Sequence, residues 1–264
     1  MVKVMKIALT KMNQVWENKQ ENMKICNNIS MQAASKKIDL LIFPEMTLTG
    51  FTLKTLEIAE CFESSESIQY FSDLARAMDY FIIAGLVVRL DNFYYNLASV
   101  HNSKGELICK YSKSHPFSPG GESLTIKPGD SPSFFEVNDI KFALTICYDL
   151  RFSGFFDALA DKTDCIVNIA NWPAQRVEQW KVLLRARAIE NQVYIIGVNR
   201  IGKDGNNLTY VESSYCFGPD GNQVETTFSG EYFDVVEIDK QKLLDCRIEF
   251  PLRRDKRRDF YNSF

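Results

Sequence analysis

Short apolar runs recur along the whole chain, and most of them end at a proline, a turn or a polar residue. Asp39–Phe43 ends at Pro44, and Cys165–Ala170 is followed by helical periodicity over Arg176–Asn191. Apolar runs of about four to eight residues are typical of buried strands, and apolar residues three or four positions apart indicate one face of a helix. Because strands and helices mix in this way, we expect an α/β domain with a mixed sheet or two stacked sheets.

The same patterns place the individual elements. Strands are expected over Met5–Met12, Asp39–Phe43, Phe81–Arg89, Phe93–His101, Glu106–Tyr111, Ile140–Cys147, Cys165–Ala170, Val193–Asn199, Val211–Phe217, Val224–Phe228 and Tyr232–Ile238. Helices are expected over Asn13–Lys37, Ser67–Asp79, Ser153–Asp161 and Arg176–Asn191. No linker, repeat or low-complexity stretch interrupts this pattern, so we expect a single domain over residues 1–264.

Charge and cysteine usage narrow the class of protein. The formal net charge is -3, so we expect neither a nucleic acid nor an anionic membrane as a partner. No apolar run approaches the roughly 18 residues of a membrane span, and the first ten residues do not resemble a signal peptide. The seven cysteines are scattered and odd in number, which is not the pattern of a disulfide framework. We therefore expect a cytoplasmic protein.

Several common chemistries lack their residues. The chain has two histidines, of which His101 stands beside a turn and is expected to be exposed, so a serine triad would have to depend on His115. No G-x-S-x-G, C-x-x-C, H-E-x-x-H or glycine-rich nucleotide-binding motif occurs. We therefore expect no metal and no cofactor. If the chain is an enzyme, a cysteine is its expected nucleophile.

Three reactive side chains follow apolar strands. Glu45 comes after Asp39–Phe43, Lys113 follows the strand that ends at Tyr111, and Cys147 ends its own strand. Reactive groups of α/β proteins gather at the carboxyl ends of strands, so the three can converge at one rim. Taken singly, each also has a plain interpretation: an exposed carboxylate, a surface amine and a buried structural thiol.

The residues around these positions resemble the nitrilase superfamily of carbon–nitrogen hydrolases. The similarity is carried in order by Phe43–Met46, Lys110–Phe117, Ile146–Phe152 and Asn168–Pro173, the last continuing into Leu184–Gln192. The fourth block is similar to the omega-amidase-type branch. The resemblance covers nearly the whole chain, from about Lys6 to Phe260.

That resemblance implies a four-layer α-β-β-α sandwich with mixed sheets, usually assembled as a homodimer or higher homo-oligomer. It implies Glu45 as base, Lys113 as electrostatic stabiliser and Cys147 as nucleophile. Glu122 corresponds to the family's second glutamate and lies in a long loop over residues 113–133, where a solvated carboxylate is the alternative. Pro116 departs from the family, which usually has an apolar non-proline residue there.

The resemblance also suggests a substrate. Omega-amidases act on small oxo-acid amides such as 2-oxoglutaramate, so a cation is expected to bind the substrate carboxylate. Arg151 and Arg176 are the candidates, and an internal ion pair or a dimer contact is the alternative for Arg151. Pocket walls are expected from Trp172, Phe117 and Tyr148, although aromatic residues are more often core. The basic segment 246–264 is expected to pack on the body or on a partner subunit.

Three other interpretations stay open. The same residues could serve a nitrilase, an N-carbamoyl hydrolase or a deaminated-glutathione amidase. The fold could instead be a non-catalytic interaction module. A thiol redox sensor would need a second cysteine near Cys147, and the next one along the chain is Cys165.

Overall fold

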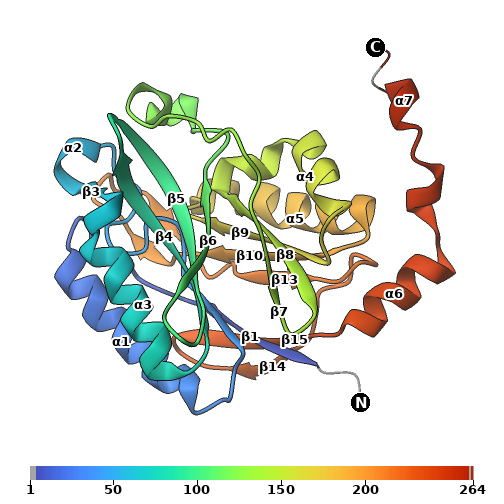
Figure 1. Ribbon diagram of the computed structural model, residues 1–264, viewed down its shortest axis with the longest axis horizontal. Coiled ribbons are helices and arrows are strands. Elements are labelled where there is room, and N and C mark those ends of the chain that lie inside the picture. Colours follow the sequence, from blue (N-terminus) through green and yellow to red (C-terminus); the bar gives the residue numbers. More distant parts are fainter. Residues whose placement is uncertain (1–3, 262, 264) are drawn as a thin grey trace.

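The computed structural model describes residues 4–261 and 263, and two mixed sheets stack face to face at its centre (Figure 1). The first sheet has eight strands in the order β14-β15-β1-β2-β4-β5-β6, with β3 paired to β4. Its strands are β1 (Met5–Thr10), β2 (Leu40–Ile42), β3 (Glu60–Cys61), β4 (Phe81–Leu90), β5 (Phe93–His101), β6 (Leu107–Ser112), β14 (Thr226–Ser229) and β15 (Phe233–Ile238).

The second sheet has five strands in the order β13-β10-β9-β8-β7. They are β7 (Phe134–Val137), β8 (Ile140–Ile146), β9 (Cys165–Ala170), β10 (Tyr194–Asn199) and β13 (Tyr215–Phe217). The three central strands run parallel to one another, and both edge strands are antiparallel to their neighbours. The carboxyl ends of β8, β9 and β10 therefore lie at one edge of this sheet.

Helices cover the two outer faces. α1 (Lys19–Ala34) and α3 (Glu66–Met78) lie on the first sheet, and α4 (Ser153–Ala160) and α5 (Val177–Asn191) lie on the second (Figure 1). The layers therefore follow the order helices, sheet, sheet, helices. This arrangement confirms the expected four-layer α-β-β-α sandwich.

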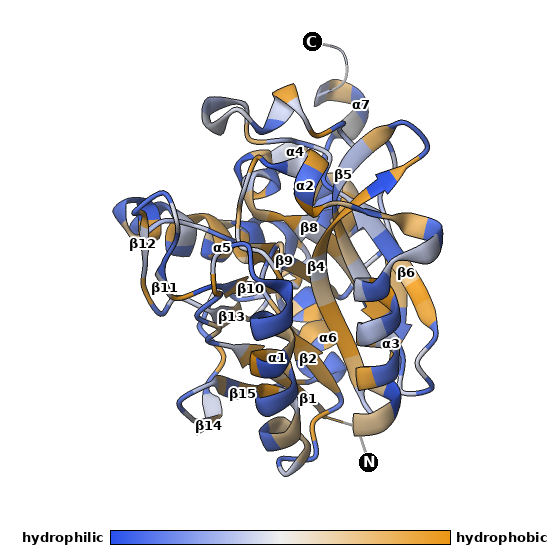
Figure 2. Ribbon diagram, turned by 90° about the vertical axis from the view of Figure 1, so that its left-hand side faces the viewer, coloured by the Kyte–Doolittle hydropathy of each residue, from blue (hydrophilic) through white to orange (hydrophobic). Residues whose placement is uncertain are grey.

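Three apolar layers hold the sandwich together. The layer between the sheets contains side chains of both, among them Ile83 and Leu144. The layer under α1 and α3 includes Phe71, and the layer under α4 and α5 includes Trp180. Central strands are buried on both faces, which is why their sequences are continuous apolar runs rather than alternating ones. Figure 2 shows this hydrophobic colouring on β1, β2 and β4, with polar residues on the helix surfaces.

Most expected elements form close to their expected bounds, with a few exceptions. The first helix begins at Lys19 rather than near Asn13, because the side chain of Asn18 accepts a hydrogen bond from the N–H of Glu21 and caps the helix there. The strand expected over Val211–Phe217 is shorter in the structure, where β13 begins at Tyr215. Elements that the periodicity did not indicate include α2 (Thr55–Ile58), β3, β7, β11 (Gly202–Lys203), β12 (Thr209–Tyr210) and α6 (Lys240–Glu249).

The C-terminal part of the chain extends away from the sandwich in Figure 1. It comprises α6, a 3-10 turn over Leu252–Asp255 and α7 (Arg258–Tyr261). Two arginines nevertheless bind the body: Arg247 donates to the carbonyl of Gln192, and Arg253 donates to the carbonyl of Ala160 at the end of α4. Among the described residues, no helix is both long and apolar enough to cross a membrane.

The expectation that His101 is exposed was wrong. Its ring is fully buried, with Nδ1 2.9 Å from the hydroxyl of Ser72 and Nε2 3.0 Å from the hydroxyl of Ser99. Ser99 donates its own proton to the carbonyl of Ala84, so it accepts one from Nε2 of the neutral ring. Burial lowers the pKa of His101 to about 4. β5 extends to His101 itself and places the ring under α3. The local sequence gives no sign that this helix covers the ring.

This buried ring predicts an acid-sensitive fold. A histidine whose folded pKa lies below its unfolded value of about 6.5 contributes stability above that pH, and this contribution is lost as the pH falls toward 4. The full contribution is about 3 kcal/mol. Urea unfolding of the wild type from pH 7 to pH 4 should show this loss. His101→Gln should have a flatter dependence, and Lys104→Ala, on the nearby turn, should keep the wild-type slope. Equal slopes for His101→Gln and wild type would contradict the assignment.

Candidate active site

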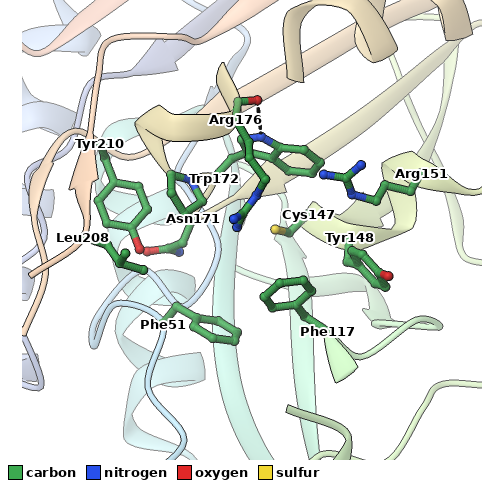
Figure 3. A pocket seen from close by; sticks show the side chains of 11 residues that line it. Phe51, Phe117, Cys147, Tyr148, Arg151, Asn171, Trp172, Arg176, Leu208 and Tyr210 are labelled. Carbon is green, nitrogen blue, oxygen red and sulfur yellow. Dashed lines mark hydrogen bonds between the residues drawn. The ribbon is translucent and has the colours of Figure 1, made fainter. Parts of the chain in front are cut away.

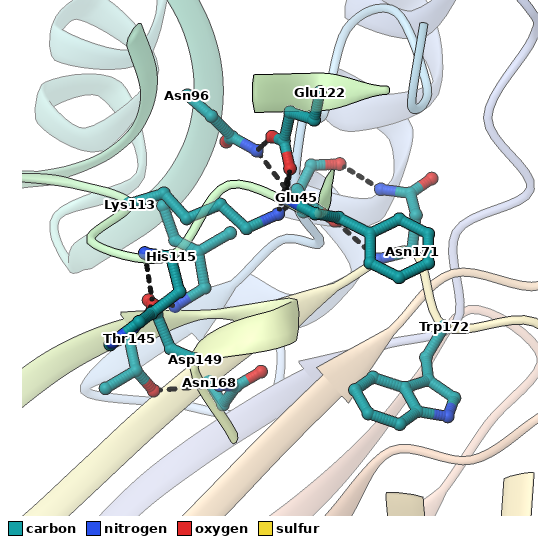
Figure 4. Close-up of polar contacts among 12 residues, drawn as sticks. Glu45, Asn96, Lys113, His115, Glu122, Thr145, Asp149, Asn168, Asn171 and Trp172 are labelled. Carbon is teal, nitrogen blue, oxygen red and sulfur yellow. Dashed lines mark hydrogen bonds and ion pairs between the residues drawn. The ribbon is translucent and has the colours of Figure 1, made fainter. Parts of the chain in front are cut away.

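A fully buried lysine lies between two fully buried carboxylates at the rim where the sheets meet (Figure 4). Nζ of Lys113, which follows β6, is 2.9 Å from Oε1 of Glu45 and 2.8 Å from Oε2 of Glu122. Asn96 of β5 joins the same group, because its Nδ2 donates to Oε1 of Glu45 at 2.7 Å and to Oε1 of Glu122 at 2.8 Å. We call Glu45, Asn96, Lys113 and Glu122 the charge cluster.

Glu45 is fixed by both sheets. It follows β2 of the first sheet, while Oε2 accepts from the backbone N–H of Asn171, which follows β9 of the second sheet, at 2.9 Å. The side chain of Asn171 also donates to the Glu45 carbonyl. Beneath this loop, Gly85 of β4 allows a close approach: a Cβ there would lie 2.4 Å from the backbone nitrogen of Met46. A side chain at position 85 would therefore displace the Glu45 loop.

Glu122 is held by its own loop. Two short 3-10 turns, Ser118–Gly120 and Glu122–Leu124, fold the chain back so that Oε2 of Glu122 accepts the N–H of Phe117 at 2.5 Å. The N–H of His115, on the other side of Pro116, binds Asp149. Pro116 thus stands between two N–H groups that are both used, so the N–H that it lacks is not one of the donors that bind Asp149 or Glu122.

Cys147 occupies a sharp turn. It follows the last residue of β8 and opens a 3-10 turn over Cys147–Arg151, with a backbone φ of 46°. Residues other than glycine seldom adopt such positive φ values, and those that do concentrate at functional sites. The turn brings Cys147, a half-buried residue, to the wall of a pocket.

A third buried carboxylate, that of Asp149, ties this turn to the lysine segment. Asp149 accepts the backbone N–H of Ile146, the hydroxyl of Tyr111 at 2.7 Å and both the backbone and the ring Nδ1 of His115. Tyr111 and His115 flank Lys113 in the sequence. Asp149 therefore fixes the position of the Cys147 turn relative to the Lys113 segment.

The electrostatics of the thiol follow from this geometry. Burial raises the pKa of Cys147 well above its usual value, and the charges of Glu45 and Glu122 add to the rise, while Lys113 and the N–H of Asn171 lower it only in part. Burial alone would lower the pKa of Lys113, but attraction to the two glutamates raises it above its usual value. The resting site therefore holds a thiol and an ammonium.

The pocket in front of Cys147 is small, and aromatic side chains form much of its wall (Figure 3). Its volume is about 60 Å³, well below the roughly 300–1,000 Å³ of pockets that hold drug-sized ligands. The lining residues are Phe51, Phe117, Cys147, Tyr148, Arg151, Asn171, Trp172, Pro173, Arg176, Leu208 and Tyr210. All five expected substrate-binding residues, Phe117, Tyr148, Arg151, Trp172 and Arg176, thus lie on its wall.

The two arginines differ in their surroundings. The guanidinium of Arg151 donates to Gln179 at 2.7 Å and lies 4.9 Å from the ring of Trp172. The guanidinium of Arg176 points into the pocket in Figure 3, 5.8 Å from the ring of Phe117, and finds no hydrogen-bond acceptor among residues 4–261 and 263. Within the described part of the chain, Arg176 is therefore the arginine of the two whose guanidinium has no hydrogen-bond partner.

The carbon–nitrogen hydrolase family model matches residues 6–243. The chain belongs to the carbon–nitrogen hydrolase family. A 2-oxoglutaramate amidase of Bacillus subtilis is 32% identical to it over 88% of this chain and 90% of that protein. An omega-amidase of Xenopus laevis is 31% identical over 92% of both chains. The family expected from the sequence, and its omega-amidase-like branch, are thereby confirmed.

Solved structures of this carbon–nitrogen hydrolase family share the fold. A superfamily protein of Xanthomonas campestris, solved with an arsenic adduct in its active site, superposes with a TM-score of 0.89 at 28% identity and covers 96% of this chain and 97% of its own. Nit3 of Saccharomyces cerevisiae, a nitrilase-superfamily member, superposes with a TM-score of 0.85 at 24% identity over 97% of both chains.

Sequence reasoning missed several residues of this hydrolase site. Asn96 lies inside a strand, and Asp149 was noted only as part of the block around Cys147. Phe51, Asn171 and Tyr210 line the pocket, and of these only Asn171 stood in a block that carried the resemblance. Asn96 and Tyr210 have no signal in a single sequence, since their neighbours come from distant segments.

The cysteine needed by a redox sensor lies far from the site. Cys165 pairs with Phe142 at the beginning of the parallel strands, whereas Cys147 follows their far end. At about 3.3 Å per residue, the two positions are separated by about 16 Å along the sheet. A disulfide between Cys147 and Cys165 would require the strands to come apart.

Removing Lys113 should lower the free energy of unfolding, because the two glutamates of the charge cluster then lack their cation. Lys113→Met leaves two buried carboxylates without their cation, and losing one partner of a buried ion pair costs about 3–5 kcal/mol. Protons can replace the missing charge, so the deficit in unfolding free energy should shrink as the pH falls. Urea unfolding at pH 7.5 and pH 5.5 measures both effects. Lys110→Met, an exposed neighbour, should cost little at either pH. A deficit that does not change with pH would argue against this charge balance.

Proposed function

We propose that this chain hydrolyses the terminal amide of a small oxo-dicarboxylic acid, of the 2-oxoglutaramate type, to a carboxylate and ammonia through a thioester on Cys147. The observation that carries the proposal is the charge cluster itself: a base and an ammonium lie buried beside a thiol that faces a small pocket. The amidase names of the Bacillus subtilis and Xenopus laevis relatives support the substrate class.

Acylation begins with the neutral thiol. Because the thiol is protonated at rest, it needs a base as it attacks the amide carbon. We assign that role to Glu45, whose Oε2 accepts one hydrogen bond, from the N–H of Asn171, whereas Oε1 accepts two. The thiol proton passes to Glu45, the sulfur–carbon bond forms, and the carbonyl oxygen gains negative charge. Nζ of Lys113 and the backbone N–H of Tyr148 stabilise this oxyanion.

The remaining steps return the site to its starting state. The tetrahedral intermediate collapses as Glu45 gives its proton to the nitrogen, the carbon–nitrogen bond breaks and ammonia leaves. Glu45 then takes a proton from a water molecule, which attacks the thioester carbon. The carbon–sulfur bond breaks, the thiolate recovers the proton held by Glu45, and the carboxylic acid that forms loses its own proton to solvent as the carboxylate. Glu122 holds Lys113 in place throughout.

The free carboxylate of the substrate is assigned to Arg176. A guanidinium binds a carboxylate through two parallel hydrogen bonds, which requires donors that are not already engaged. Arg176 meets that condition, whereas Arg151 is engaged by Gln179 and Trp172. The backbone carbonyl of Arg176 accepts Nε1 of Trp172, which fixes the base of the side chain at the pocket wall.

The oligomeric state and the cellular location of the protein are also proposals. A cytoplasmic homodimer or higher homo-oligomer, with neither nucleic acid nor membrane as partner, remains our prediction. Exposed apolar side chains on the C-terminal segment and on α5 support an interface between copies: Val182, Ile189, Ile248, Phe250, Phe260 and Tyr261. The single domain over residues 1–264 is likewise proposed, with segment 246–264 on the body or the partner.

The thioester predicts a trappable cysteine. Ammonia release from 2-oxoglutaramate should fall by at least about a thousandfold in Cys147→Ala, since the covalent route is lost. Intact-mass analysis in a single turnover should find an acyl group on Cys147. Cys109→Ala, a partly buried thiol of β6, serves as the matched control and should keep full activity. Normal turnover by Cys147→Ala would end this mechanism, and preference for a nitrile or a carbamoyl compound would reassign the substrate.

The assignment of the carboxylate predicts a difference between two arginines. Arg176→Gln should raise KM for 2-oxoglutaramate by about 10- to 100-fold, because charge-assisted hydrogen bonds to the substrate are lost. A short monoamide without a carboxylate should be hydrolysed equally by this variant and the wild type. Arg151→Gln, the matched control, should change KM much less. The reverse order of effects would move the carboxylate site to Arg151.

A further inference from the structure

Asn96 stands between the two glutamates of the charge cluster and belongs to none of the roles assigned so far. Its side chain is fully buried in β5, and its single amide nitrogen donates to Glu45 at 2.7 Å and to Glu122 at 2.8 Å (Figure 4). The orientation of the amide follows from chemistry, since ionised carboxylates only accept hydrogen bonds. Oδ1 then points away and has no partner among the described residues.

The hydrogen bonds of the two carboxylates are unequal. Oε1 of Glu45 accepts from both Lys113 and Asn96, whereas Oε1 of Glu122 accepts from Asn96 alone within the described part of the chain. Both oxygens lie within one hydrogen bond of the same nitrogen, so they face each other across it. Without that nitrogen, Lys113, which binds Oε1 of Glu45 and Oε2 of Glu122, would be the one side-chain donor left between the two carboxylates in the described part of the chain.

Two carboxylates that approach each other without a donor between them tend to share a proton, because like charges in a buried site disfavour double ionisation. A shared proton would occupy the group that must accept the thiol proton. One lysine between two glutamates leaves the cluster with a net negative charge, so Lys113 alone does not remove this tendency. A neutral donor to both carboxylates does so without adding charge.

We infer that Asn96 is a positioning residue of the amidase reaction proposed above: it separates Glu45 from Glu122 and keeps Glu45 free of a proton and ready to act as the base. The inference rests on that proposed function. The charged and titratable groups that face the two carboxylates are Lys113, from the segment after β6, and the thiol of Cys147, with Tyr210 beyond the thiol.

The backbone at this position is independent of the amide. The carbonyl of Asn96 accepts the N–H of Lys113 at 2.8 Å, and β5 pairs with β4 on its other side. A substitution at position 96 therefore removes the amide while the main chain still places Lys113. This makes the side chain testable by itself.

The decisive measurement is the pH profile of kcat/KM for ammonia release by Asn96→Ala. Loss of a hydrogen bond to a charged group should move the acid limb to higher pH by about one unit, because Glu45 then keeps a proton over a wider range. Well above the limb, kcat should approach the wild-type value with little change in KM. Asn96→Asp adds a third carboxylate and should move the limb further. A lower rate at every pH with an unmoved limb would show a merely structural role and overturn the inference.

Two further variants distinguish loss of the Asn96 hydrogen bonds from a general loss of packing or folding. Asn168→Ala removes another fully buried asparagine, one that donates to Thr145 instead of a carboxylate, and should leave the limb in place. If Asn96→Ala does not fold, Asn96→Ser retains one donor, and the same shift should appear in smaller size. No shift in that variant would overturn the inference.

A second measurement does not need the substrate. The rate of Cys147 alkylation by iodoacetamide should show the same acid limb and the same shift in Asn96→Ala. If the wild type releases ammonia from no oxo-acid amide but the alkylation limb shifts, the proposed function fails and the role of Asn96 stands. If amide hydrolysis is found and neither limb moves, the role of Asn96 fails and the proposed function stands.

Discussion

The ammonium of Lys113 is removed from water, and that fact governs the architecture around it. A buried charge is tolerated only when it is paired and its hydrogen-bonding capacity is used. Lys113 meets this condition through Glu45 and Glu122, and each of these carboxylates needs donors of its own from other segments. Asn96, the N–H of Asn171 and the N–H of Phe117 supply them. One buried cation thus requires contributions from both sheets and from the loop after β6.

The same burial gives the cluster its chemistry. In a site screened from water, charges act on one another more strongly than they would on the surface. The thiol of Cys147 therefore stays protonated beside two carboxylates, and Lys113 stays protonated between them. In the reaction that we propose, a carboxylate placed in this way accepts the proton, and the ammonium stabilises the oxyanion. Asp149 keeps the Cys147 turn in register with the Lys113 segment through its hydrogen bonds to Ile146 and Tyr111.

Much of this architecture could be predicted from the sequence. Runs such as Cys165–Ala170 are apolar without interruption because they are central strands, and the glutamate, lysine and cysteine that follow such runs meet at one rim. Features that depend on contacts between segments far apart in the sequence could not be predicted. Asn96 is one polar residue inside a strand, and its importance comes from Glu45 and Glu122, which lie far away in the sequence. His101 was misjudged because a neighbouring turn says nothing about which face of the strand a helix covers.

The apolar layer between the sheets has a role beyond stability. Glu45 and Lys113 are carried by one sheet, and Cys147 and Asn171 by the other. The side chains packed between the sheets, such as Ile83 and Leu144, therefore set how far the sulfur of Cys147 lies from the carboxylate of Glu45. Stacked sheets lie about 10 Å apart, and a change of a single methylene in a close-packed layer is felt by its neighbours. The alignment of the groups that we propose to react therefore depends on aliphatic residues that do not line the pocket.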